Sequence, residues 1–195
     1  MRYLLLQRLK EKLYFDSKDI AQLFKIKAES SWVLCNRYVK KGIFIRLKKD
    51  TYTLSENWNI WEWKNFLKVS NFLQVPSYIS FMTALSFYGI TTQLQRDFFE
   101  SASLKRSERF RIKGVIFNFY KLKRKYYFDF VKKDDIFIAT PEKAFIDALY
   151  LYSFGKYRLD FSSLDLDKLD KIRIKKMMQI YPEKTKALIK KICRI

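Results

Sequence analysis

A helix expected over about Glu29 to Lys41 presents side chains that can read the edges of DNA bases. Its inward side, at the i, i+3, i+4, i+7 spacing, is Ser31, Leu34, Cys35 and Tyr38. The outward side then carries Ser30, Trp32, Val33, Asn36, Arg37 and Lys40. Arg37 suits guanine and Asn36 suits adenine through two hydrogen bonds each, and Val33 suits the methyl group of thymine. We predict four base-reading residues: Ser30, Val33, Asn36 and Arg37.

Basic residues on both sides of this helix suit the phosphates of the same duplex. Phosphate contacts position a protein on DNA without reading sequence. The residues predicted for this role are Lys18, Lys25, Lys27, Lys40, Lys41, Arg46, Lys48 and Lys49. The alternative is that the same scaffold serves only for protein contact.

The elements that position these residues have the order of a winged helix-turn-helix, in which the third helix lies in the major groove. A first helix is expected from Arg2 to Leu13, with Leu5, Leu6, Leu9 and Leu13 as its apolar stripe. A second opens at Asp16 or Ser17, either a good N-cap, and the third stops at Gly42. Two strands, residues 43–45 and 52–54, then flank a basic turn.

The charge of the chain favours a polyanionic partner. The 195 residues carry a net charge of +20, distributed in blocks. Residues 1–54 hold 13 basic and 5 acidic side chains, and residues 105–125 and 171–195 each hold 9 and 1. The intervening stretches together are net acidic. The abundance of Lys, Phe, Tyr, Ile and Asn is typical of proteins from AT-rich genomes, and codon usage could account for part of the charge. A uniform drift in amino-acid composition would not, however, leave acidic stretches between basic blocks.

The second half of the chain predicts a mixed α+β domain with a helical tail. A helix over Ile60–Leu73 links the domains, and Ser80 caps a helix over Phe81–Tyr88. Strands are expected at residues 97–102, 109–112, 115–122 and 136–139. Thr140 and Pro141 open a helix to about Tyr152, whose inward side is Ala144, Phe145, Ala148, Leu149 and Tyr152. Two more helices, broken at Tyr181–Pro182, follow. The predicted fold class is α+β, with domains 1–56 and 57–195 and a helical tail over about 161–195.

Two segments of this second half carry a family resemblance. The stretches Pro76–Gly89 (PSYISFMTALSFYG) and Ile138–Leu149 (IATPEKAFIDAL) resemble the two signature stretches of AbiEi-type antitoxins of type IV toxin–antitoxin systems. The order of the elements is also similar: winged helix, first stretch, strands, second stretch and helical end. Many relatives have Gly in the wing turn where this chain has Lys49-Asp50-Thr51-Tyr52, and Asp50 tolerates the turn conformation.

The resemblance implies a cytoplasmic autorepressor that binds inverted repeats in its promoter, with a dimer on DNA as one option. It also implies that the second domain counteracts a nucleotidyltransferase toxin, generally without a stable complex. The alternative is direct sequestration of a toxin or an RNA by the basic second domain, with a winged helix that does not read sequence. The surface proposed for either role comprises Lys105, Arg106, Arg109, Arg111, Lys123, Arg124, Lys175, Lys176, Lys190 and Lys191.

The sequence argues against an enzyme. It contains no histidine, which excludes Ser-His-Asp, Cys-His and His-ligated metal sites, and it has no P-loop or Gly-x-Gly-x-x-Gly motif. We predict no cofactor and no metal. A nuclease would need carboxylates for a divalent metal, and the candidates are Asp129, Asp134, Asp135 and Asp147. The Asp134-Asp135 pair fits a turn better.

The remaining polar and sulfur groups have structural alternatives. In the signature stretches, five polar residues stand out as either functional or fold-supporting: Tyr78, Ser80, Glu142, Lys143 and Asp147. Cys35 and Cys193 lack metal-like spacing and are expected as reduced thiols in the cytoplasm. No apolar run approaches membrane-spanning length, and Gln7, Arg8 and Lys10 interrupt the apolar start before a signal-peptide core forms.

Overall fold

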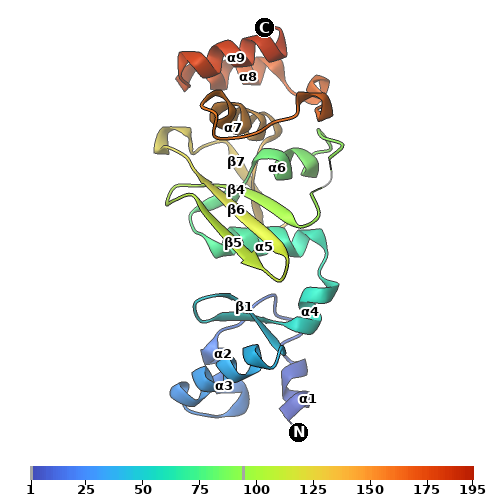
Figure 1. Cartoon of the computed structure of the whole chain (residues 1–195), viewed down its shortest axis with the longest axis vertical. Helices are drawn as coiled ribbons and strands as arrows, with labels where there is room; N and C mark the ends of the chain where they lie inside the picture. Colours follow the sequence, from blue (N-terminus) through green and yellow to red (C-terminus); the bar gives the residue numbers. More distant parts are fainter. Residues whose placement is uncertain (1, 94) are drawn as a thin grey trace. The chain divides into compact units, whose positions relative to one another are not determined.

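The computed structural model describes residues 2–93 and 95–195 and is a mixed α+β fold (Figure 1). The α-helices are α1 Arg2–Gln7, α2 Ser17–Phe24, α3 Ala28–Lys40, α4 Ser55–Ile60, α5 Trp63–Leu73, α6 Phe81–Phe87, α7 Pro141–Ser153, α8 Lys171–Met177 and α9 Glu183–Cys193. The strands are β1 Phe44–Lys48, β2 Thr51–Leu54, β3 Ser77–Ile79, β4 Phe98–Ser103, β5 Glu108–Ile112, β6 Val115–Lys121, β7 Phe130–Lys133 and β8 Ile136–Ala139. Short 3₁₀ helices are η1 Arg124–Tyr126, η2 Phe161–Ser163, η3 Leu166–Lys168 and η4 Met178–Ile180.

The chain divides into two compact units. The first comprises the chain up to Val69 together with Ile112–Gly114, and the second comprises Ser70–Arg111 and Val115–Ile195. The boundary expected after residue 56 lies earlier than this division. Helix α4 follows directly on β2, and the Asn57 side chain donates a hydrogen bond to the Lys10 carbonyl at 2.9 Å. The chain just past residue 56 therefore packs with the first unit.

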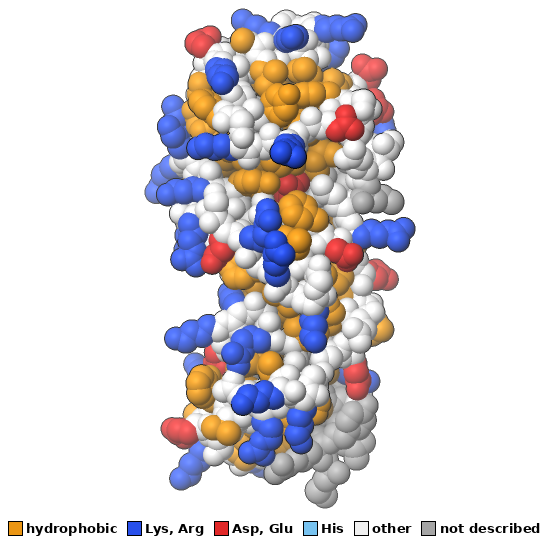
Figure 2. All heavy atoms as spheres, in the orientation of Figure 1, with side chains coloured by type: hydrophobic (Ala, Val, Ile, Leu, Met, Phe, Trp, Pro, Cys, Tyr) orange, Lys and Arg blue, Asp and Glu red, His pale blue; other side chains and the backbone are white. Residues whose placement is uncertain are grey.

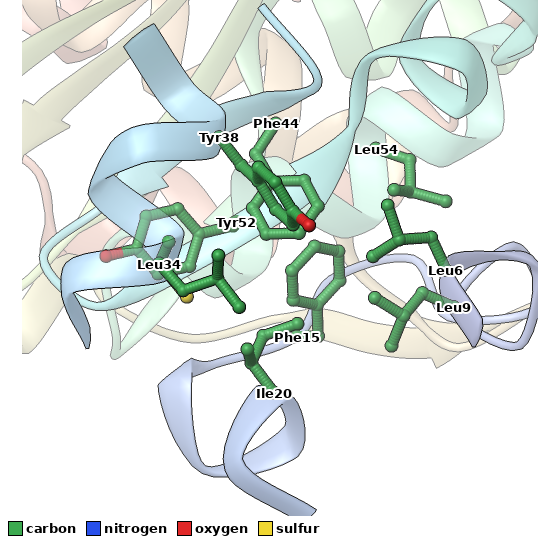
Figure 3. Packing of buried hydrophobic residues seen from close by; sticks show 10 residues of the cluster. Leu6, Leu9, Phe15, Ile20, Leu34, Tyr38, Phe44, Tyr52 and Leu54 are labelled. Atoms are coloured by element: carbon green, nitrogen blue, oxygen red, sulfur yellow. The ribbon is translucent and has the colours of Figure 1, made fainter. Parts of the chain in front are cut away.

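The core of the first unit fixes which side of α3 faces inward. Its buried members, most of them labelled in Figure 3, are Leu6, Leu9, Phe15, Ile20, Leu34, Cys35, Tyr38, Phe44, Tyr52 and Leu54. The Phe44 ring lies 4.8 Å from the Phe15 ring and 5.0 Å from the Tyr38 ring, both edge-on. All four residues predicted on the inward side of α3 are buried, so that prediction is confirmed.

Helix α1 is shorter than predicted. The stripe ending at Leu13 implied a helix of that length, but α1 ends at Gln7 and the chain continues in turns closed by i→i−3 hydrogen bonds. The reason lies at Phe15, whose backbone exchanges hydrogen bonds of 2.9 and 2.8 Å with Tyr52. A helix carried to Leu13 would leave no room for the chain to become extended there. Leu6 and Leu9 are buried as expected, while Leu13 is only half-buried.

The ends of α2 and α3 follow the predicted caps. The Asp16 carboxylate accepts hydrogen bonds from the backbone of Lys18 and Asp19, and the Asp19 carboxylate accepts one from the Asp16 backbone. This capping box satisfies amide groups that the first helical turn leaves without partners. At the other end, α3 stops at Lys40 and Gly42 takes a left-handed φ of 72°.

The predicted β1–β2 hairpin forms, but β1 extends to Lys48, so its turn is Lys49-Asp50 and not the longer basic turn from Arg46 to Asp50 that was expected. The register is irregular between Arg46 and Lys48. Asp50 adopts a left-handed φ of 50°, which short polar residues tolerate better than most side chains. Its carboxylate also accepts a hydrogen bond of 2.8 Å from the Ser17 hydroxyl, which ties the turn to the start of α2. The expectation that Asp50 accommodates this turn is confirmed.

The segment after the hairpin differs from the prediction. We expected a break at Ser55–Asn57 and one helix over Ile60–Leu73, but α4 begins at Ser55 and the break falls at Trp61–Glu62. The Ser55 hydroxyl donates to the Gly42 carbonyl at 2.5 Å, which fixes the chain as it leaves the hairpin. The rings of Trp58, Trp61 and Phe66 then pack together across the break, with centroids 5.1–5.5 Å apart.

The second unit is built on one sheet with strand order β5-β6-β4-β3-β8-β7. Strands β4 and β6 pair in parallel, as do β3 and β8, while β3–β4 and β7–β8 are antiparallel. The four predicted strands are confirmed, but β3 and β7 were not predicted. Strand β3 has only three residues beside a proline, and the edge strand β7 ends in two lysines, so neither shows the apolar alternation of a strand.

Helix α7 forms the centre of this unit, and the tail packs on it. Its Thr140 cap and Pro141 start are confirmed, and it is buried on nearly every side. Tyr152 is an exception: it is 37% exposed and not inward as predicted, because α7 ends at Ser153 and Tyr152 packs edge-on with Phe161 of the following segment. Helices α8 and α9 pack on α7 and are broken at Tyr181–Pro182, as predicted. In the described part of the chain, every helix is too short or too polar to span a membrane.

Candidate nucleic-acid interface

The outward face of α3 is exposed over its N-terminal half. Trp32 and Val33 are each 54% exposed, and Ser30 and Arg37 are also exposed. In Figure 2 lysine and arginine side chains lie on the visible face of the first unit, which Figure 1 draws around α2, α3 and β1. Trp32 and Val33 thus add exposed apolar surface to a face that also carries cations.

Asn36 and Arg46 join α3 to the hairpin. The Arg46 guanidinium donates a hydrogen bond to the Asn36 side-chain oxygen, and it also lies 5.6 Å from the centre of the Tyr52 ring. The geometry gives Asn36 a role that the sequence did not predict. The Asn36 side-chain oxygen accepts this hydrogen bond and so positions Arg46 beside the helix. The bond must break before Asn36 can pair with adenine through both its oxygen and its amino group.

The predicted phosphate contacts fall into groups along the first unit. Lys18 lies in the first turn of α2, Lys25 and Lys27 lie in the turn before α3, and all three are exposed. Lys40 and Lys41 are exposed at the other end of α3, about 18 Å away at 1.5 Å per residue. In the hairpin, Arg46 and Lys49 are exposed and Lys48 is half-buried.

A shallow depression beside the first half of α3 includes a residue that was not predicted. It is lined by Ile26, Glu29, Ser30, Val33, Leu34 and Arg37. Three predicted base-reading residues therefore border one concave surface. Glu29 shares it, and a carboxylate can accept a hydrogen bond from the amino group of cytosine. The sequence signal that could have identified Glu29 as a base-contacting residue is its position at the N-terminal end of the predicted helix.

The basic residues of the second unit are divided among several places. Lys105 and Arg106 precede β5, and Lys123 and Arg124 follow β6, so these four lie at one end of the β5–β6 hairpin, where the Lys121 backbone donates to Ser107 at 2.9 Å. Arg106 pairs with Glu108 at 2.8 Å. The remaining members of the predicted surface are elsewhere: Arg109 and Arg111 along β5, Lys175 and Lys176 on α8, and Lys190 and Lys191 at the far end of α9.

Arg109 is partly committed to the sheet itself. Its Nε donates to the Asn118 side chain at 3.0 Å, and its guanidinium lies 6.0 Å from the centre of the Phe98 ring. Arg111, two residues further along the same strand, is exposed. Arg109 therefore has a packing role as well as a charge.

The two signature stretches meet in a buried polar network. Asp147 of α7 accepts hydrogen bonds from the Tyr78 hydroxyl at 2.9 Å and the Ser80 hydroxyl at 2.8 Å. Lys143 pairs with the same carboxylate and donates to the Tyr181 hydroxyl at 3.2 Å. Because the Ser80 hydroxyl is used in this way, it does not cap α6 as predicted.

Burial controls the ionisation of this network. Lys143 and Asp147 have no exposed side-chain surface. Burial lowers the pKa of Lys143 and raises the pKa of Asp147, and the attraction between the two charges opposes both shifts. Every polar group here has a partner within the fold, so the geometry favours support of the sheet–helix contact over a reaction with an external substrate.

Glu142 belongs to a different network, which holds the tail. Its carboxylate accepts from the Asp170 backbone at 3.2 Å and lies 3.7 Å from the Arg173 guanidinium. Arg173 also donates to Asp129 at 2.6 Å, and Asp129 in turn accepts from Thr140 at 2.5 Å. Arg173 of α8 is thereby fastened to both the start of α7 and the chain before β7.

The carboxylates considered for a nuclease metal lie in separate surroundings. Asp129 pairs with Arg173 and Asp147 with Lys143, while Asp134 and Asp135 occupy the β7–β8 turn with left-handed φ values of 51° and 62°. Within residues 2–93 and 95–195 no three His, Cys, Asp or Glu side chains gather as metal ligands. The expected turn at Asp134-Asp135 is confirmed.

Both cysteines are buried and unpaired with each other. Burial raises the pKa of Cys35 to about 12 and also raises the pKa of Cys193. A thiol is a weak nucleophile when its pKa is high, so neither side chain is suited to covalent chemistry.

Comparisons with known proteins bear on the fold. No protein-family model matches the chain. No curated protein matches it in sequence either. The crystal structure of the Rv2827c protein from Mycobacterium tuberculosis is similar, with a TM-score of 0.63 and 7% sequence identity over 98% of this chain and 76% of that chain. At this identity the similarity shows a shared fold and nothing about function, so the resemblance to AbiEi-type antitoxins stays a prediction.

Proposed function

We propose that the first unit is a winged helix-turn-helix that binds duplex DNA, with α3 in the major groove and the β1–β2 hairpin as the wing. One observation carries the proposal: the hydrogen bond from Arg46 to Asn36 joins the basic hairpin to the exposed face of α3. A helix that enters the groove and a cation that reaches the flanking phosphate then belong to one surface. The core residues beneath this face make it a preformed surface.

The proposed role in the cell is that of a cytoplasmic autorepressor and antitoxin. The first unit binds inverted repeats in its own promoter, as one protomer at each half-site, and the second unit counteracts a nucleotidyltransferase toxin. The contact between the two signature stretches supports this proposal, because Ile79 of the first pairs with Ile138 of the second and Tyr78 and Ser80 bond to Asp147. The two stretches that resemble the family pattern therefore contact each other in the fold.

The DNA-binding proposal is tested with the full chain and two fluorescent duplexes, its own upstream DNA and a scrambled sequence. We expect tighter binding to the upstream duplex, with log K falling steeply against log salt. Arg37→Ala should remove about 1–3 kcal/mol of that preference, because Arg37 is assigned to a base. Lys49→Ala should weaken binding to both duplexes equally and reduce the salt slope by about one.

Lys171→Ala is the matched control, since Lys171 is an exposed cation in the other unit and belongs to neither predicted binding surface. It should leave both affinities close to those of the parent protein. If Arg37→Ala leaves the preference for the upstream duplex intact, the assignment of the α3 face is wrong. Equal and weak affinity for both duplexes would refute sequence reading altogether.

A second candidate function is direct sequestration of the toxin or of an RNA by the second unit. The observation that favours it is the cluster of Lys105, Arg106, Lys123 and Arg124 at one end of the β5–β6 hairpin. Co-purification with an acidic toxin encoded next to this chain, lost on substitution of these four residues, would support it. Failure to form that complex at low salt would count against it.

A further inference from the structure

A cleft in the second unit has the size and lining of a small-molecule site. It holds about 420 Å³, within the range of about 300–1,000 Å³ typical of ligand pockets. Its lining includes Glu100, Phe98, Tyr120, Tyr157, Lys156 and Arg158. None of them was predicted as a site residue, and the cleft lies wholly within one unit.

Glu100 lies at the base of this cleft, and one of its carboxylate oxygens makes only a weak hydrogen bond with the described residues. The side chain belongs to a residue that is 2% exposed. Its Oε2 accepts from the Tyr157 hydroxyl at 2.8 Å and from the Met82 backbone at 3.2 Å. Among the described residues, its Oε1 accepts one hydrogen bond, a long one of 3.4 Å from Tyr120. Each carboxylate oxygen has two acceptor directions, so Oε1 has capacity for a donor from a ligand.

The backbone beside Glu100 is held in a rare conformation. Phe81 is fully buried and has a left-handed φ of 57°, which is uncommon for a bulky residue. Its ring packs against Tyr120 and Tyr157, with centroids 4.7 and 5.4 Å away. The next residue, Met82, is the one whose N–H reaches Glu100. The carboxylate is thus held from three elements, α6, β6 and the loop after α7.

The mouth of the cleft is basic and its walls are aromatic. Lys156 and Arg158 are exposed on the loop after α7. Asp160 of the same loop also lines the cleft, but its carboxylate accepts hydrogen bonds from Ser162 and Gln93. Phe98 and Tyr120 are half-buried aromatic side chains of the lining, and the exposed part of their rings offers apolar surface to a planar ring. A ligand for this cleft needs a hydrogen-bond donor at its inner end, a planar ring and an anionic outer end.

We propose that this cleft binds a nucleotide whose base carries an exocyclic amino group, with the amino group donating to Glu100 and the phosphate bound by Lys156 and Arg158. A simple cation would be repelled at the mouth, and a simple anion would be repelled by Glu100. An amino-bearing nucleotide satisfies both ends at once. The same chemistry is offered by a free nucleotide and by the terminal nucleotide of an RNA. This site is independent of the DNA-binding proposal.

The test is calorimetric titration of the full chain with GMP, AMP and IMP. IMP is the matched ligand, because it keeps the purine and the phosphate but lacks an exocyclic amino group. At pH 8, above the pKa of about 7 that burial gives Glu100, we expect GMP or AMP to bind at least about tenfold more tightly than IMP, as a hydrogen bond to a charged group would give. Equal affinity of the three, or binding by none of them at millimolar concentration, would overturn the proposal.

Variants separate the two ends of the ligand. Lys156→Gln combined with Arg158→Gln should weaken binding of the preferred nucleotide at least about tenfold and leave its nucleoside little changed, and both residues are exposed, so the fold is retained. Lys132→Gln with Lys171→Gln is the matched control, because both are exposed lysines of the second unit outside the cleft and outside the predicted basic surface, and it should have no effect. A comparable loss in the control would reduce the site to general charge attraction and refute it.

Glu100→Gln should abolish the preference for the amino-bearing base, with circular dichroism to check folding. Persistence of that preference in a folded Glu100→Gln protein would refute the assigned contact. An RNA trinucleotide that ends in the preferred nucleoside identifies the source. Tighter binding than the mononucleotide supports an RNA end, and equal or weaker binding supports a free nucleotide.

Discussion

Replacing Glu100 with glutamine should make the second unit more stable above neutral pH. Burial raises the pKa of this carboxyl from 4.5 to about 7, although the hydroxyls of Tyr157 and Tyr120 and the Met82 N–H favour the charged form. The folded protein therefore holds a proton on Glu100 over a pH range in which the unfolded chain has released it. The stability that this protonation contributes is complete below pH 4.5 and is lost as the pH rises through about 7.

The size of the effect follows from the same two pKa values. A difference between 4.5 and about 7 corresponds to about 3 kcal/mol in the free energy of unfolding between acidic and alkaline pH. Glutamine has nearly the same shape and cannot ionise. Its carbonyl oxygen can accept from Tyr157 and Met82, and its amino group can donate to the Tyr120 oxygen. The variant should therefore keep the stability that the parent protein loses when Glu100 is deprotonated at higher pH.

The assay is urea denaturation of both proteins from pH 5 to pH 8, followed by circular dichroism. All four tryptophans lie before Val69, in the first unit, so tryptophan fluorescence reports that unit separately. The unfolding free energy of the variant minus that of the parent should increase by up to about 3 kcal/mol as the pH rises. The fluorescence transition should be the same in both. Asp167→Asn, at an exposed acid of the second unit, is the control. Parallel pH curves for the parent and Glu100→Gln would refute the reasoning.

Three further substitutions each test one contact that lies within a single unit. Lys143→Met should lower the unfolding free energy of the second unit by about 3–5 kcal/mol, measured in urea, because it leaves the buried Asp147 charge unpaired. Adding Asp147→Leu should recover part of that loss. No recovery would contradict a buried unpaired charge as the cause. Asp16→Ala should lower the stability of the first unit by about 1 kcal/mol, read by tryptophan fluorescence, through loss of the α2 cap, and an unchanged midpoint would argue against the capping box. Asn36→Ala should weaken binding to upstream and scrambled DNA alike if its role is to position Arg46, whereas loss of the preference alone would show that Asn36 reads a base.

Local chemistry in the first unit was sufficient to predict most of its elements. The Asp16 cap, the Gly42 stop and the inward side of α3 each depend on residues close in sequence, and all three are present in the structure. The end of α1 depends instead on Phe15 pairing with Tyr52, which is far along the chain. No local pattern contains that constraint.

The second unit shows the same limit more strongly. Strand β3 is short and gains its place from neighbours on both sides, Ser101 on β4 and Ile138 on β8. Ser80 has the sequence signature of a cap, but Asp147 competes for its hydroxyl. Glu100 was visible as an acid within an apolar strand, yet the tyrosines that surround it come from distant segments. The cleft therefore became evident only in three dimensions.

Tyr181 has a consequence for how the chain matures on the ribosome. Its hydroxyl completes the partners of Lys143, and its ring stacks on Tyr126 at 4.5 Å. Until residue 181 has been synthesised, Lys143 lacks this hydrogen-bond partner and Tyr126 lacks this stacking ring. The clustered core of the first unit, in contrast, lies between Leu6 and Leu54, so it can be assembled early in translation. In a nascent chain the first unit can therefore fold before the polar network of the second is complete, so the two units mature at different times.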